Sequence, residues 1–111
     1  MKSSFKVIYN PQIYYDIQKI VDYYRKETGN NLLGKRFIQK VKSELKRLNQ
    51  SALHYQIRYD DIRCLPIPPF QIMAHYRVDE NNLIVRVEAI IHTSKDPGEW
   101  KMRTRPDDNQ N

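Results

Sequence analysis

The sequence predicts a two-layer α+β fold, in which a pair of helices packs on one face of a small, mostly antiparallel sheet. Two observations support this fold class. Hydrophobic patterns along the chain follow the order strand, helix, helix, strand, strand, strand. The last three strands are joined by connections too short for crossovers, which makes them antiparallel neighbours. With 111 residues and no internal repeat or linker, we expect a single domain over 1–111, a core over 5–100 and a frayed tail over 103–111.

The first strand and helix are predicted from local signals. Residues 4–9 alternate between apolar and polar side chains, which is typical of a short strand. Asn10 and Pro11 follow, and we expect the helix to start at Pro11 because asparagine caps a free N–H and proline has none. The charges of this helix cancel, and the apolar spacing ends at Gly29, a residue typical of a left-handed helix end.

The second helix is predicted after Asn30 and Asn31, and it carries most of the excess charge. Gly34 falls on its buried stripe, where we expect it to allow close approach of the first helix. Six cations flank that stripe in two rows, Lys35, Lys42 and Lys46 in one and Arg36, Lys40 and Arg47 in the other. The lone acid is Glu44, so the helix holds +5 of the net charge of +6. This face is either a solvated surface whose long side chains cover the core edge or a binding surface.

The rest of the sheet is predicted from three alternating runs. A strand at 59–65 is broken by the prolines of 66–69, and a hairpin follows with strands over 70–78 and 83–92. Period-two alternation assigns to the core Phe70, Ile72, Ala74, Tyr76, Val78, Leu83, Val85, Val87, Ala89 and Ile91. It assigns to the opposite face Gln71, Met73, His75, Arg77, Arg86, Glu88 and His92. That face is either a functional site or a row of ordinary polar strand residues.

Composition excludes several classes of protein. The single cysteine, Cys64, excludes an intramolecular disulfide and suits a reducing compartment. No metal-ligand spacing is present, so we expect neither a metal nor a cofactor. The apolar runs fall far short of the roughly 18 residues that span a bilayer, and we expect a soluble, cytoplasmic protein. Nineteen Lys and Arg residues against thirteen Asp and Glu indicate an anionic partner, either nucleic acid or an acidic protein.

Three segments carry a resemblance to a known family. The run Tyr76–Glu80, the strand Ile84–Ile91 and the ending His92–Pro97 resemble the RelE/ParE superfamily of bacterial toxins, with a match over 5–100. The most specific part is a strand ending in His, followed by a basic residue and Asp, here Lys95 and Asp96, which is similar to the ParE-type ending. The resemblance implies a type II toxin–antitoxin system, in which a growth-inhibiting toxin associated with plasmid stabilization forms a hetero-oligomer with its cognate antitoxin.

The superfamily offers two targets, since ParE-like members poison DNA gyrase and RelE-like members cleave messenger RNA on the ribosome. The pattern of RelE-type nucleases includes an Arg early in the third strand, and an Arg and a Tyr near the carboxy terminus. This chain has Gln71 or Ile72 at the first position and Ser94 and Trp100 near the end. We therefore predict a ParE-like toxin that binds DNA gyrase and is not an enzyme. An mRNA endoribonuclease and a non-toxic partner-binding domain are the alternatives.

These readings assign residues to sites. Target binding is assigned to His92, Lys95, Asp96 and Trp100, although Trp100 has the alternative role of packing the carboxy-terminal segment onto the sheet. Antitoxin binding is assigned to the six cations of the second helix. A nuclease would instead use His75 or His92 to move protons, Arg63, Arg77 and Arg86 to neutralise phosphate, and Glu88 to orient a histidine.

Overall fold

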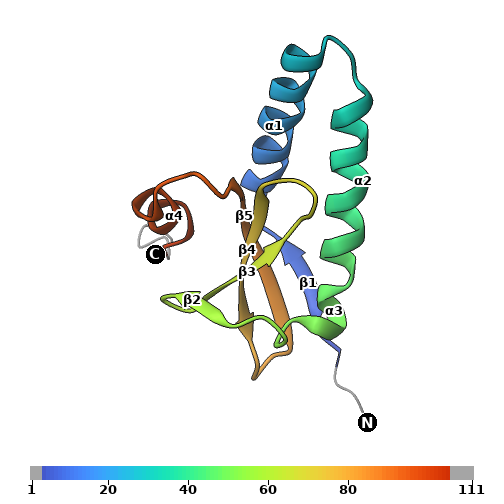
Figure 1. Ribbon diagram of the computed structural model, residues 1–111. Helices are drawn as coiled ribbons and strands as arrows, with labels where there is room; N and C mark the ends of the chain where they lie inside the picture. Colours follow the sequence, from blue (N-terminus) through green and yellow to red (C-terminus); the bar gives the residue numbers. More distant parts are fainter. Residues whose placement is uncertain (1–3, 106–111) are drawn as a thin grey trace.

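A computed structural model describes residues 4–105 and places two long helices against one face of a five-stranded sheet (Figure 1). The strands are β1 (Lys6–Tyr9), β2 (Ile57–Tyr59), β3 (Ile62–Pro66), β4 (Ile72–Asp79) and β5 (Ile84–His92). The helices are α1 (Gln12–Thr28), α2 (Leu32–Lys46), α3 (Leu48–Ser51) and α4 (Pro97–Thr104). The sheet order is β1-β5-β4-β3-β2, with only the β1–β5 pair parallel. The predicted α+β class and the mostly antiparallel sheet are confirmed.

The helical pair forms as its local signals predict. The Asn10 side chain accepts a hydrogen bond from the Gln12 N–H at 2.9 Å, and Gly29 ends α1 with φ of 76°. At Gly34 on α2, an added Cβ would lie 3.0 Å from Cγ1 of Val21 on α1. The glycine therefore permits the close approach of the two helices that the sequence predicts.

The main core lies between this helical pair and the sheet. Its largest fully buried side chains include Phe37 of α2 and Tyr76 of β4, and the Tyr76 hydroxyl donates a hydrogen bond to the Ala52 carbonyl at 2.7 Å. That bond satisfies the one polar atom which the ring carries into the core.

No helix within residues 4–105 has both the length and the apolar character needed to cross a membrane.

The last strand contains a β-bulge that the alternation does not reveal. Tyr76 pairs with Val87 and His75 pairs with Ala89, so Glu88 is an extra residue between two successive pairs. Both Glu88 and Ala89 therefore face away from the helical pair. From this point the inward and outward positions of β5 are exchanged.

The bulge corrects the predicted faces of the hairpin. Ile90 belongs to the core under the helical pair, whereas Ala89 and Ile91 lie in a second apolar cluster on the opposite face. The prediction that these two residues share a core with Val85 and Val87 was therefore wrong. His92 was also predicted to share a face with His75, but it lines a groove beside α1 instead. A one-residue insertion in the ladder explains both errors, because side chains alternate with a period of two.

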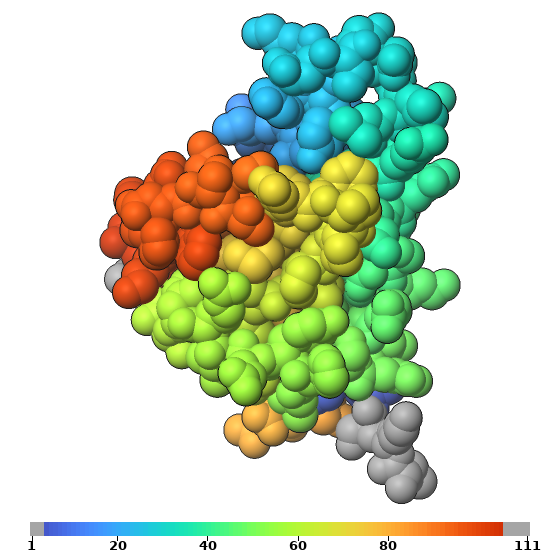
Figure 2. All heavy atoms as spheres, in the orientation of Figure 1, coloured from blue at the N-terminus to red at the C-terminus, as the bar shows by residue number. Residues whose placement is uncertain are grey.

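Two further segments differ from expectation. The predicted strand at 59–65 is a tight hairpin of β2 and β3, which turns at Asp60 with φ of 48°. Residues 97–104 form α4, so the predicted frayed tail is helical at 103–104, and the rest of that prediction over 106–111 lies outside the described residues. This helix covers the opposite face of the sheet. In Figure 2 the end of β5 and α4, in orange and red, lie directly against the β2–β3 hairpin in light green.

Candidate binding groove at the end of β5

His92 ends β5, and local hydrogen bonds orient its ring. Its Nδ1 accepts the Ser94 backbone N–H at 3.0 Å and lies 2.7 Å from the Ser94 hydroxyl. Because Nδ1 accepts a hydrogen bond from the Ser94 N–H, the neutral ring carries its hydrogen on Nε2. The Lys95 N–H closes the turn on the His92 carbonyl at 3.1 Å. Two of the predicted target-binding residues, His92 and Lys95, are therefore brought together by one turn.

Asp96 begins α4. Its carbonyl accepts the N–H groups of Glu99 at 2.8 Å and Trp100 at 3.3 Å, and Pro97 occupies the first helical turn. An exposed carboxylate at this position is favoured by the partial positive charge of the helix start. Asp96 therefore has a structural reason to be acidic, beside the target-binding role predicted for it.

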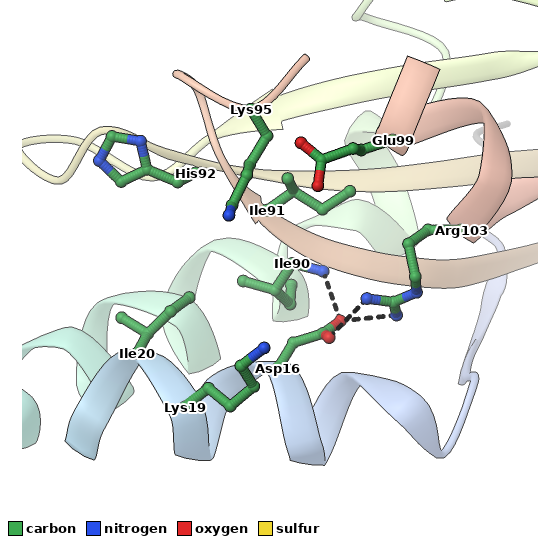
Figure 3. A pocket seen from close by; sticks show the side chains of 9 residues that line it. All are labelled: Asp16, Lys19, Ile20, Ile90, Ile91, His92, Lys95, Glu99 and Arg103. Carbon is green, nitrogen blue, oxygen red and sulfur yellow. Dashed lines mark hydrogen bonds and ion pairs between the residues drawn. The ribbon is translucent and has the colours of Figure 1, made fainter. Parts of the chain in front are cut away.

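Two adjoining cavities form one groove between α1, the end of β5 and α4, which we call the His92 groove. The cavities have volumes of ≈ 270 Å³ and ≈ 500 Å³ and share Lys19, Ile20, His92 and Lys95. The first, drawn in Figure 3, is also lined by Asp16, Ile90, Ile91, Glu99 and Arg103. The second is also lined by Tyr23, Tyr24, Ile72 and Ser94. The α1 wall was missed from the sequence, because it joins the groove only when α1 packs beside β5.

A buried carboxylate holds the groove in shape. Asp16 of α1 accepts the Ile90 backbone N–H at 3.0 Å and two hydrogen bonds from the Arg103 guanidinium at 2.6 and 2.8 Å (Figure 3). The Asp16 side chain is only 7% exposed. One side chain therefore ties α1 to β5 and α4. Neither member of this ion pair was predicted, and Arg103 falls in the segment expected to be frayed.

Trp100 packs the carboxy-terminal helix onto the sheet. It is buried, and its ring centroid lies 5.3 Å from that of His75 and 6.0 Å from that of Tyr59. The Arg58 guanidinium stands over the indole at 5.7 Å. Trp100 thus takes the packing role given as its alternative.

His75, a candidate nuclease residue, is completely buried beneath α4. Its Nδ1 lies 2.9 Å from the Tyr59 hydroxyl and 3.5 Å from Sγ of Cys64. Burial, with the cations of Arg58 and Arg103, lowers the pKa of His75 from 6.5 to about 4. The ring is therefore neutral at physiological pH and closed to substrate.

The lowered pKa of His75 predicts a loss of stability in acid. The unfolded chain takes up the proton near pH 6.5 and the folded chain only near pH 4, so this contribution is complete above pH 6.5 and is lost as the pH falls toward 4. We expect the free energy of unfolding to fall by about 3 kcal/mol across that window. Urea unfolding of the protein and of His75→Gln at several pH values measures the difference. If the free energy of unfolding changed with pH in the same way for the two proteins, the acid-dependent loss of stability could not be assigned to His75.

The other candidate nuclease residues are held by protein partners. Arg77 donates to Glu88 at 2.6 Å, to Asp61 at 3.0 Å and to the Thr104 carbonyl at 2.8 Å. Its guanidinium lowers the pKa of Asp61. Arg86 lies 3.1 Å from Glu88, and Arg63 donates to the Tyr55 carbonyl at 2.6 Å. Arg63 and Arg77 thus attach the sheet to the segment before β2 and to α4, whereas Arg86 pairs within β5.

The cationic face of α2 divides into a paired and an unpaired part. Lys40 and Arg47 lie 3.2 and 3.6 Å from Glu44, which is buried. Within residues 4–105, the other four cations make no ion pair, and all four are exposed: Lys35, Arg36, Lys42 and Lys46. Within residues 4–105, no three His, Cys, Asp or Glu side chains lie close enough together to hold a metal ion.

Comparison with known proteins agrees with this architecture. The fold matches that of a solved chain described as the chromosomal ParDE TA system from P. aeruginosa, with a TM-score of 0.70 and 18% identity over 82% of this chain and 98% of that one. A sequence model of the family described as ParE toxin of type II toxin-antitoxin system, parDE, matches residues 7–97, and the chain belongs to this family. No curated protein matches the sequence. The predicted resemblance to the RelE/ParE superfamily is confirmed, on its ParE side.

Proposed function

We propose that this ParE-family toxin arrests growth by binding DNA gyrase through the His92 groove, and that a cognate antitoxin neutralises it. The observation that supports binding most strongly is the contrast between two sets of polar residues. Apart from His92, the residues that a nuclease would need are buried or held by protein partners, whereas His92 and Lys95 line an open groove. A surface that recognises a protein needs exposed charge and apolar pockets, and this groove offers both.

The alternative of mRNA cleavage has less support. General acid–base chemistry needs a proton carrier within reach of the substrate. His75 is sealed under α4, and Arg77 is engaged by two carboxylates. His92 is the one candidate histidine that lines the groove, and no arginine free of an ion pair lines it with His92.

The exposed lysines of α2 support the proposed antitoxin surface. Exposed cations attract an acidic partner and accelerate encounter, and a segment that folds as a helix on binding is a suitable ligand for a helix face. Lys42 and Lys46 lie one helical turn apart, so both can face one acidic stretch. The toxin and antitoxin would then form a hetero-oligomer.

Charge reversal on α2 tests the antitoxin surface. We expect Lys42→Glu/Lys46→Glu to slow antitoxin association by roughly tenfold and to flatten its dependence on salt, because steering by these charges is lost. Lys101→Glu, an exposed lysine of α4, is the matched control and should bind like the parent. Stopped-flow association over a range of salt concentrations provides the measurement. Identical rates and salt slopes for the double variant and the parent would exclude this surface.

Induction of the toxin alone, without antitoxin, tests the proposed function in cells. Growth arrest with DNA damage and no codon-phased cuts in ribosome-bound messages is the expected result. Cuts in the ribosomal A site that disappear in His92→Ala would establish the nuclease alternative. Unimpaired growth with intact antitoxin binding would establish the non-toxic alternative.

A further inference from the structure

One exposed row of α1 leads into the His92 groove. Tyr15, Lys19 and Tyr23 are spaced four residues apart, so they lie one above another on the same face of the helix. All three are exposed, and the Lys19 ammonium stands 6.0 Å from the centre of the Tyr15 ring. Exposed tyrosines on a rigid helix are typical of a contact surface.

Two lysines from distant parts of the chain converge on the groove. In Figure 3 the amino groups of Lys19, from α1, and Lys95, from the turn after β5, point into the same space. Neither has an ion-pair partner in the part of the chain that the structure describes. Two unpaired ammonium groups facing one cavity favour a ligand with negative charge.

The acids of the groove do not cancel this charge. Asp16 is neutralised by Arg103, and Glu99 lines only the first of the two cavities. The second cavity has Lys19 and Lys95 at its edge and no carboxylate among its lining residues. Its net charge is therefore positive.

The floor of the groove is apolar and decides the kind of anion. Ile20 and Ile72 line the second cavity, with the ring of Tyr24 beside them. Ile20 and Ile72 carry no hydrogen-bonding group, so they suit the apolar contact that an aliphatic or aromatic side chain of a protein makes. The floor therefore favours a protein ligand.

We propose that the His92 groove binds an acidic segment of the target protein, with an apolar side chain on Ile20 and Ile72 and a neighbouring carboxylate between Lys19 and Lys95. The proposal rests on the proposed function in assigning the groove to the target, and it adds α1 as a specificity-determining wall. An interface of this kind needs both walls of the groove. The apolar anchor and the carboxylate would each contact one residue of α1 and one residue of the opposite wall.

Charge reversal on both walls of the groove tests the proposal. Lys19→Glu and Lys95→Glu are compared with Lys26→Glu, an exposed lysine of the same helix that does not line the groove. Purified gyrase is the binding partner, measured at low and at physiological ionic strength. We expect Lys19→Glu and Lys95→Glu each to weaken binding about tenfold and to flatten its salt dependence, with growth arrest reduced in parallel. Lys26→Glu should match the parent, and melting temperatures should be the same for all.

The outcomes separate this inference from the proposed target. Suppose that Lys19→Glu binds gyrase and arrests growth like the parent, while Lys95→Glu does not. That result would overturn the proposed role of α1 in target binding and leave gyrase as the target. If the parent does not bind gyrase, the assignment of gyrase as the target fails. Loss of growth arrest in Lys19→Glu but not in Lys26→Glu would then still support the groove as the target-binding site. Growth arrest by Lys19→Glu equal to that of the parent would overturn the groove proposal. Tight binding of a fluorescent single-stranded oligonucleotide, lost in Lys19→Glu, would also overturn it by making the ligand a nucleic acid.

Discussion

Trp100→Ala is expected to lower the free energy of unfolding by about 3–5 kcal/mol, because it removes the large side chain that joins α4 to the sheet. The indole contacts the second apolar cluster, and its loss leaves a cavity above His75 and Tyr59. Urea unfolding followed by circular dichroism measures the change, since the variant has no tryptophan left for fluorescence.

Met102 provides the control for this substitution. It lies on the same helix but is 72% exposed, so Met102→Ala should change the free energy of unfolding by less than about 0.5 kcal/mol. A loss of less than about 1 kcal/mol for Trp100→Ala would show that α4 is only loosely attached to the sheet.

Asp16→Ala is expected to cost about 3–4 kcal/mol, because it leaves the Arg103 guanidinium and the Ile90 N–H without their shared acceptor. The matched control is Asp22→Ala on the same helix. Asp22 pairs with Arg25, but its side chain is 49% exposed, so we expect a loss of about 0.5 kcal/mol. Equal losses for the two variants would contradict the role of Asp16 in joining the three elements.

A double-mutant cycle between Asp16→Ala and Arg103→Ala isolates the ion pair from other effects. Because the two residues are in direct contact, we expect a coupling energy of about 1–3 kcal/mol. Additive losses would mean that Asp16 acts through the Ile90 N–H alone.

Local features of the fold were predictable because neighbours in the sequence cause them. The cap at Asn10 and the end of α1 at Gly29 depend on backbone groups only a few residues away. The close approach at Gly34 followed from its place on the buried stripe, which is also a local periodicity.

Features that depend on distant contacts were not predictable in the same way. Asp16 and Arg103 are 87 residues apart, and nothing in the balanced charges of the first helix distinguishes Asp16 from its neighbours. His75 was expected at a half-exposed site because α4 was not predicted to cover it. Burial by a later segment is a property of the tertiary fold.

One missed feature did leave a signal in the sequence. Ala89, Ile90 and Ile91 form a continuous apolar run directly after Glu88, which strict alternation cannot explain. Such a run indicates a strand covered on both faces, and here it marks both the bulge and the cover by α4.

The proposal that the toxin acts by binding gyrase is tested most directly by gyrase-catalysed supercoiling of relaxed plasmid DNA with purified toxin. We expect inhibition that rises with toxin concentration, is relieved by the antitoxin and is weakened about tenfold by Lys95→Glu. Full supercoiling activity at saturating toxin, with a toxin that still arrests growth, would contradict the account.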